Sequence, residues 1–343
     1  MSLPAFHFQC GAYDRAGPAP PSETGVALWG HMAQSSVEPA VLRIGSRGSP
    51  LALIQARAVR DRLAAAHGFD SARITIDAIR TSGDMIQDRP LAEAGGKGLF
   101  TKEIEEALLA DRIDLAVHSA KDVPTFLPSG LVLSAYLPRE DARDVLISAK
   151  AKTLQDLPAG ATVGTASPRR QAIVKRARPD LQVISLRGNV ETRLRKLDQG
   201  HADATILALA GLKRLDLTGA IAAILSTDEF LPAVGQGAIV VETREDDSRT
   251  REFLARIDHA DTAIALTCER AFLAVLDGSC RAPIAGHATI AGDVLSFRGM
   301  ILKPDGSQCF ETSRRGNRPD ATALGTDAGR ELKHQGGADF FLS

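Results

Sequence analysis

A lysine–aspartate pair is the first place in the sequence where the residue types could do chemistry. Residues 118–124 read HSAKDVP and directly follow the apolar segment 113–117. At the end of a strand, the Asp122 carboxylate can protonate a leaving amine, take a proton from carbon or stabilise a developing cation, and the Lys121 ammonium can bind a carboxylate. A solvated ion pair in a polar loop explains the same residues equally well, so the placement at a strand end is what favours a functional reading.

Basic side chains are concentrated in one part of the chain. Residues 165–196 hold nine Lys and Arg against two acidic residues, a net charge of +7 within a chain whose formal net charge is −1. The motif GTASPRRQ (164–171) begins this segment and runs from a predicted strand into a predicted helix. Its polar side chains are those of Thr165, Ser167, Arg169 and Arg170. A Ser-Pro helix start explains the serine but does not need two guanidinium groups, which are suited to carboxylates.

Further arginines fall at similar predicted strand-to-helix turns. They are Arg47, together with Ser49, in GSRGSP (45–50), and Arg187 and Arg193 in SLRGNVETR (185–193). Because the carboxyl ends of parallel strands meet at one edge of a sheet, these side chains predict an arginine-rich pocket for a ligand with several carboxylates or phosphates. Neither GxxxxGK[ST] nor GxGxxG is present, so a polycarboxylate fits better than a nucleotide.

The cysteines predict neither a disulfide framework nor a metal site, because no CxxC pair and no nearby Cys/His spacing occurs. They are Cys10, Cys268, Cys280 and Cys309. Cys268 lies in an apolar segment and is expected to be buried. Cys280 lies in a Gly-Ser loop beside Arg281, where a thiolate would be accessible and stabilised, and is therefore a candidate reactive group.

Predicted strands and helices alternate along the chain, which indicates βαβ units and an α/β fold. Strands are expected at 41–45, 73–79, 113–117, 145–148, 162–164, 183–185, 204–208 and 238–242, and helices at 50–66, 99–110, 168–177 and 189–199. The pattern then changes to a helix at 262–276, three hairpin-like strands near 284–290, 294–300 and 308–312, and a helix at 321–334. These segments predict two α/β lobes and a smaller α+β C-terminal domain.

Length and composition agree with a folded protein of several domains, since 343 residues with 44% hydrophobic content can bury sizeable cores. The predicted parts are a poorly ordered extension at 1–40, a first α/β lobe at 41–139 plus about 236–256, a second at 140–235, and an α+β domain at 257–343. No apolar run reaches the roughly 20 residues needed to span a bilayer, and a cytoplasmic location fits the cysteine usage.

Nine motifs, taken in order, resemble the hydroxymethylbilane synthase (porphobilinogen deaminase) family. They are IGSRGSPLAL (44–53), TSGD (81–84), GGKGLF (95–100), DLAVHSAKDVP (114–124), GTASPRRQ (164–171), SLRGNVETRLRKLD (185–198), LALAGLKRL (207–215), LPAVGQGA (231–238) and GSCRAPI (278–284). The resemblance implies a three-domain α/β transferase, whose first two lobes are similar to those of periplasmic binding proteins. Nothing in the sequence demands a partner subunit, and the net charge of −1 and the lack of a long apolar run indicate neither a nucleic-acid nor a membrane partner, so a monomer of the cytoplasm is expected.

The resemblance also implies a reaction and a cofactor. Four porphobilinogen molecules are joined head to tail with loss of ammonia on a dipyrromethane cofactor, which the enzyme makes from its own substrate and holds by a thioether to Cys280. Water then releases 1-hydroxymethylbilane for porphyrin and heme biosynthesis. By the same resemblance Asp122 is the catalytic carboxylate and also contacts the cofactor. The other expected cofactor-binding residues are Lys121, Thr165, Ser167, Arg169 and Arg170, and the expected substrate-binding residues are Arg47, Ser49, Phe100, Arg187, Arg193 and Arg214.

Two other functions use some of the same residues. A catalytically silent binding protein for a small polycarboxylate would need the lobes and arginines, but not Asp122 or Cys280. A nucleic-acid-binding protein would use the basic segment, although an aromatic content of 4% leaves little material for base stacking.

Overall fold

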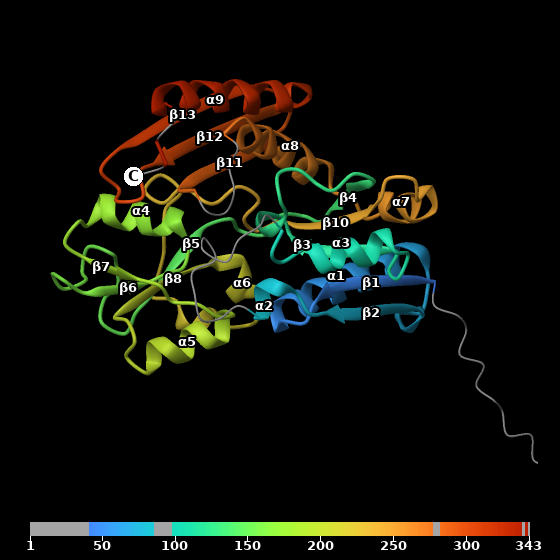
Figure 1. Ribbon diagram of the computed structural model, residues 1–343, viewed down its shortest axis with the longest axis horizontal. Helices are drawn as coiled ribbons and strands as arrows, with labels where there is room; N and C mark the ends of the chain where they lie inside the picture. The colour runs from blue at the N-terminus through green and yellow to red at the C-terminus, as the bar shows by residue number, and fades with distance from the viewer. Residues whose placement is uncertain (1–40, 86–97, 277–281, 338–339, 342–343) are drawn as a thin grey trace, which may run out of the picture. The chain divides into compact units, whose positions relative to one another are not determined.

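Strands and helices alternate along the chain as expected, and over the described residues the strands form three sheets (Figure 1). The computed structural model describes residues 41–85, 98–276, 282–337 and 340–341. The extension expected at residues 1–40 lies outside them.

Sheet A has the strand order β2-β1-β3-β10-β4, in which β1, β2 and β3 are parallel and β10 is antiparallel to both of its neighbours. Its strands are β1 (Leu42–Arg47), β2 (Ile74–Ile79), β3 (Leu115–Ser119), β4 (Leu131–Tyr136) and β10 (Ile239–Arg244), with helices α1 (Pro50–His67), α2 (Ser82–Met85), α3 (Lys102–Leu109) and α7 (Ser248–Ala255). Ser49 caps α1, Pro50 starts it, and Gly68 ends it in the left-handed conformation at φ 69°.

Sheet B repeats this arrangement with the order β7-β6-β8-β5-β9, where β6, β7 and β8 are parallel and β5 is antiparallel to its neighbours. Its strands are β5 (Asp144–Ile147), β6 (Thr162–Gly164), β7 (Gln182–Ile184), β8 (Ala204–Ala208) and β9 (Ala223–Ile224), with helices α4 (Pro168–Ala177), α5 (Val190–Asp198) and α6 (Leu209–Arg214). In both sheets the predicted functional motifs follow the carboxyl ends of the parallel strands, as βαβ topology requires.

Sheet C is an antiparallel meander with α8 and α9 packed against it (Figure 1). Its strands are β11 (Ile284–Ala291), β12 (Val294–Leu302) and β13 (Cys309–Asn317), and the helices are α8 (Ala260–Val275) and α9 (Ala321–Gly336). Phe272 of α8 and Phe297 of β12 are fully buried in this core with ring centroids 5.0 Å apart. The two α/β sheets and the smaller α+β part agree with the fold class expected from the sequence.

The chain passes twice between sheets A and B. We call residues 137–143, which join β4 to β5, the first crossover, and residues 225–238, which join β9 to β10, the second crossover. The two crossovers touch, because the Glu140 N–H donates to the Gly237 carbonyl at 3.2 Å. A Cβ at Gly237 would lie 2.3 Å from the Glu140 carbonyl oxygen, and its φ of 89° also favours glycine.

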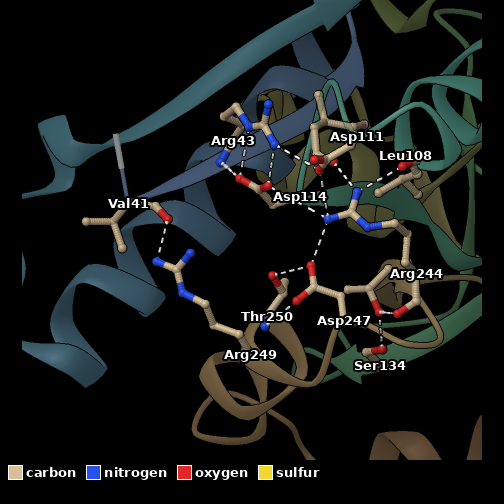
Figure 2. Close-up of polar contacts among 12 residues, drawn as sticks. Val41, Arg43, Leu108, Asp111, Asp114, Ser134, Arg244, Asp247, Arg249 and Thr250 are labelled. Carbon is tan, nitrogen blue, oxygen red and sulfur yellow. Dashed lines mark hydrogen bonds and ion pairs between the residues drawn. The ribbon is translucent and has the colours of Figure 1, made fainter. Parts of the chain in front are cut away.

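An ionic network lies at the amino end of β3, opposite the end that leads to Asp122 (Figure 2). Arg43 Nη2 lies 2.7 Å from Asp114 Oδ1, and Arg244 Nη2 lies 2.8 Å from Asp247 Oδ2. Arg244 Nη1 also donates to the carbonyls of Leu108 and Ile113, each at 2.8 Å. This one guanidinium therefore ties the end of α3, the approach to β3 and the start of α7 together.

Replacing Arg244 with Met is expected to lower the free energy of unfolding by about 2 kcal/mol, because a charged donor to two carbonyls and a carboxylate is lost. Urea denaturation measures this, and the catalytic rate should stay near that of wild type because the network lies at the other end of the strand from Asp122. Arg249→Met is the matched control, since Arg249 is exposed and makes one long hydrogen bond to the Val41 carbonyl, at 3.5 Å (Figure 2), and a distant contact with the Phe253 ring, 5.8 Å from its centre. Equal effects of the two changes would contradict the role given to Arg244.

Candidate active site

Asp122 ends a short 3-10 turn, Ala120–Asp122, that directly follows β3. The Ala120 N–H donates to the Ala238 carbonyl at 3.0 Å, which fixes the turn to the end of the second crossover. The side chain of Asp122 is 35% exposed, and its Oδ2 lies 4.0 Å from Arg47 Nη1. Asp122 lines a cavity of about 60 Å³. The lining also includes Arg47, Ser49 and Phe100, so the structure brings three of the expected substrate-binding residues to the expected catalytic carboxylate.

Arg47 ends β1 and has contacts on several sides. Its Nη2 and Nε donate to the Asp84 carboxylate at 2.5 and 3.3 Å, and its guanidinium carbon lies 4.2 Å from the centre of the Phe100 ring. Burial alone would raise the pKa of Asp84, but hydrogen bonds and charge from Arg47 bring that pKa below its ordinary value. Phe100 thus supports the flat face of Arg47, and Asp84 holds one edge of it.

Lys121 precedes Asp122 in the same turn, and its side chain is half-buried. Loss of water around the ammonium, and then the positive charge of Arg170, lower the pKa of Lys121 to about 8, although Asp122 and Asp144 oppose this shift. The Lys121 ammonium donates to Gln236 Oε1 at 3.3 Å. Because the charged form of Lys121 is disfavoured, a carboxylate that binds beside it stabilises the ammonium.

Arg169 and Arg170, in the first turn of α4, are almost fully buried and bind Asp144 at the start of β5. Arg169 Nη2 lies 2.7 Å from Asp144 Oδ2, and Arg170 Nη2 lies 2.7 Å from Asp144 Oδ1. The two arginines also donate to the carbonyls of Leu231 and Ile206, respectively. Burial would raise the pKa of Asp144, but the two arginines overcome this and lower it to about 2. In the described part of the chain, Arg169 Nε is buried without a hydrogen-bond partner.

Of the expected hydroxyl ligands, Ser49 and Ser167 cap helices α1 and α4, and Thr165 directly follows β6. Ser49 Oγ accepts from the Ala52 N–H at 3.4 Å, and Ser167 Oγ accepts from the Arg170 N–H at the same distance. Thr165 is buried, and its Oγ1 accepts from the Ser167 N–H at 3.2 Å. Each hydroxyl oxygen accepts a hydrogen bond from a backbone N–H, and each O–H group can still donate one to a ligand.

The remaining predicted arginines fall into two groups. Arg193 feels the charges of Arg170, Asp122 and Arg187, and loss of water followed by the charge of Arg170 lowers its pKa to about 10. Arg193 therefore belongs to the same electrostatic site as Asp122, and Arg187 lies close enough to Arg193 for the two charges to repel each other. Arg214, at the end of α6, instead donates to the Gly237 carbonyl at 2.7 Å and so is tied to the second crossover.

The donors gathered here suit a ligand with several carboxylates. The positive charges come from Lys121, Arg170, Arg187 and Arg193. Among the carboxylates, Asp122 and Asp144 favour the charged form of Lys121, and Asp122 favours that of Arg193. The repulsion among the cations weakens when an anionic ligand arrives, and the buried Arg169 Nε adds an unused donor. These residues therefore fit the dipyrromethane that the sequence leads us to expect, because its side chains end in carboxylates.

Cys280, the expected attachment point, lies outside the described residues, between α8 and β11. Three further residues belong to the site but are absent from the sequence-based expectations: Asp84, Asp144 and Gln236. Asp84 lies in the TSGD motif and Gln236 lies between two glycines in LPAVGQGA, which are weak signals of a special position. No signal in the sequence shows that Asp144 would pair with both arginines.

Comparison with known proteins identifies the family. Residues 42–252 match the family model "Porphobilinogen deaminase, dipyromethane cofactor binding domain", and residues 263–334 match "Porphobilinogen deaminase, C-terminal domain". The chain belongs to the porphobilinogen deaminase family. The porphobilinogen deaminases of Nitrobacter winogradskyi and Nitrobacter hamburgensis are 64% and 63% identical to it, each over 90% of this chain and 98% of the relative.

Solved structures give a weaker likeness. A nutrient-binding protein from Burkholderia cenocepacia bound to methionine matches 63% of this chain and 90% of its own, at 14% identity and a TM-score of 0.39. The BvgS VFT2 domain of Bordetella pertussis matches at 17% identity and the same TM-score, over 63% of this chain and 84% of its own. Scores this low carry no argument, and the fold rests on the strand order described above. Among the described helices, none has the length and apolarity needed to cross a membrane.

Proposed function

We propose that this chain joins four porphobilinogen molecules head to tail, with loss of ammonia at each addition, and releases 1-hydroxymethylbilane by hydrolysis. The observation that carries the proposal is the placement of Asp122, a partly exposed carboxylate at a strand end that lies among Arg47, Lys121 and Arg193. A negative charge in this position stabilises the azafulvene cation that forms when ammonia leaves porphobilinogen. The same carboxylate then accepts the proton that the pyrrole carbon loses when the new carbon–carbon bond forms.

The cofactor is proposed to be dipyrromethane held through a thioether to Cys280. When bound, it supplies a tethered pyrrole end from which the product chain grows. Lys121, Arg169 and Arg170 would neutralise its carboxylates, and the hydroxyls of Thr165 and Ser167 would donate hydrogen bonds to it. Asp122 would accept hydrogen bonds from pyrrole N–H groups.

The substrate carboxylates are assigned to a second set of residues. Arg47, Ser49 and Phe100 line the cavity beside Asp122, and the charges of Arg187 and Arg193 reach the same place. Arg214 is included because it holds the second crossover, whose end is bonded to the Asp122 turn. Each porphobilinogen brings an acetate and a propionate, so a growing chain needs several cations.

We further propose domains at 41–139 plus about 236–256, at 140–235 and at 257–343. Sheet membership supports these limits, because β10 joins sheet A after the chain has completed sheet B. We infer a monomer that works in the cytoplasm without a nucleic-acid or membrane partner. The formal charge near zero argues against a nucleic-acid partner, and the free thiols of Cys268 and Cys309, within the described residues, favour a reducing compartment.

The intact mass of the purified protein tests the proposal. Protein from cells that make porphobilinogen should be heavier than its sequence by two pyrrole units, and Cys280→Ser should lose the whole adduct and the activity. Cys309→Ser is the control, since Cys309 is a half-buried thiol in β13 and should leave the adduct in place. An unmodified wild-type mass would leave the silent polycarboxylate-binding protein as the better reading.

A further inference from the structure

Gln236 is a buried amide in the second crossover that the proposed function has not used. Its side chain is 1% exposed, and it lies between Gly235 and Gly237, whose φ angles are 75° and 89°. A buried amide has two donors and a carbonyl to satisfy, so its surroundings determine which way it points.

Two acceptors fix the orientation of this amide. Gln236 Nε2 donates to the Ala142 carbonyl at 2.7 Å and to Asp144 Oδ1 at 2.9 Å. A backbone carbonyl cannot donate, and Asp144 stays ionised because its pKa is about 2, so the NH2 group must face this side. The Gln236 carbonyl oxygen therefore faces Lys121, whose ammonium donates to it at 3.3 Å.

The backbone around Gln236 is held against the turn that carries Lys121 and Asp122. The Gly235 N–H donates to Glu269 Oε2 at 2.7 Å, and Arg139 Nε donates to the Gln236 carbonyl at 2.9 Å. A Cβ at Gly235 would lie 2.9 Å from both the Ala120 carbonyl carbon and the Lys121 nitrogen. The bond that joins the crossover to the turn itself runs from the Ala120 N–H to the Ala238 carbonyl at 3.0 Å, so the two cannot separate without breaking it.

Lys121 needs such an acceptor because its ammonium has lost water and because the charges around it act in opposite directions. Arg170 and Arg169 disfavour its ammonium form, whereas Asp122 and Asp144 favour it. The Gln236 carbonyl stabilises the ammonium without adding a negative charge that would compete with an incoming carboxylate.

We propose that Gln236 is a positioning residue that keeps the Lys121 ammonium charged and fixed beside Asp122, using Asp144 as its anchor. The carboxylate ligand of Lys121 rests on the proposed function, but the coupling between Gln236 and Lys121 does not. Through Asp144 the same amide also joins the turn of sheet A to the Arg169 and Arg170 pair of α4 in sheet B.

The first test measures Lys121 directly by NMR, with lysines labelled at Cε and the Lys121 signal assigned from Lys121→Arg. The Cys280→Ser chain is the background, so that no thioether-bound ligand contributes. Lys121 should titrate near pH 8 in this background, and Gln236→Met should lower that pKa by about one unit, because a hydrogen bond to a charged group is lost. Gln55→Met removes another buried amide, one bonded to Ser119, and should leave the titration of Lys121 unchanged.

The second test uses the holoenzyme with Cys280 intact. In Gln236→Met, the alkaline limb of the pH profile for kcat/KM should move to lower pH by a similar amount, with activity near pH 6.5 reduced less than activity near pH 8.5. A merely structural role would lower the rate equally at both pH values. Gln236→Asn, which keeps an amide but withdraws the carbonyl from Lys121, provides the same comparison if the Met variant does not fold.

The outcomes separate the two proposals. A Lys121 titration that is the same with and without Gln236 overturns the positioning role, whatever activity the chain has. An absent adduct or absent product formation in the wild type overturns the proposed function, and the NMR comparison still decides the role of Gln236.

Discussion

Asp122→Asn is expected to lower the turnover of porphobilinogen by about 10²- to 10⁴-fold while the protein stays folded. Asparagine has nearly the same shape, but it cannot hold a negative charge beside the developing cation or accept the proton that leaves carbon. The fold should tolerate the change because Asp122 is partly exposed and its ion pair with Arg47 is as long as 4.0 Å. Single-turnover product formation, divided by the fraction of chains that carry the adduct, measures the effect on chemistry alone.

Asp77→Asn is the matched control for this experiment, because it makes the same chemical change on an exposed position of β2. It should keep the wild-type rate, and both variants should melt close to the wild-type temperature. A rate for Asp122→Asn within a few-fold of wild type would remove Asp122 from the reaction.

Asp144→Ala is expected to lower the free energy of unfolding by about 3–5 kcal/mol, because it leaves two buried guanidinium groups without their carboxylate. Asp144 is fully buried and accepts from Arg169, Arg170 and Gln236, so neither relaxation nor water readily replaces it. The midpoint of urea denaturation, followed by circular dichroism, measures the loss. Asp327→Ala removes a carboxylate that also lies 2.7 Å from an arginine, Arg314, but is 68% exposed, and it should have an effect of at most about 1 kcal/mol.

The stability of the protein in acid should also depend on Asp144. Its pKa is lowered from 3.8 to about 2 in the folded protein, so its contribution to stability is complete above pH 4 and is lost as the pH falls towards 2. The free energy of unfolding of the wild type should therefore fall across this range, and that of Asp144→Ala should fall by a smaller amount. Parallel acid curves for the two proteins would show that the ion cluster does not contribute in this way.

Much of the fold follows from local patterns in the sequence. The helix expected at 168–177 is α4 as observed, because Ser167 and Pro168 mark its start unambiguously. Strand β13 runs to Asn317, beyond the expected 312, because the polar segment 313–317 pairs with β12, and Arg314 binds Asp327 and Glu331 of α9. No strand is predicted at β4, whose hydrogen-bonded neighbour, β10, lies more than a hundred residues later in the chain.

In the candidate site, too, local motifs could be predicted but contacts between distant segments could not. Motifs at strand ends predict that Arg47, Ser49 and Asp122 come together, the family resemblance adds Phe100, and all four line one cavity. Pairing inside the site could not be predicted, because it depends on acids from other elements. Asp84 accepts hydrogen bonds from the Arg47 guanidinium, and Asp144 forms ion pairs with both Arg169 and Arg170. The attachment of a cofactor to Cys280 stays a prediction.

The position of β10 sets the order in which the chain can be built during synthesis. Sheet A needs this strand between β3 and β4, yet residues 239–244 leave the ribosome only after all the strands of sheet B, which end at Ile224. Until then β4 has no neighbour in its sheet, and the core around α1 lacks Ile239, Val241 and Leu254. The strands of sheet B, which are translated second, can therefore pair with one another before sheet A is complete, and sheet A must wait with an open edge, where it is exposed to mispairing and to chaperones.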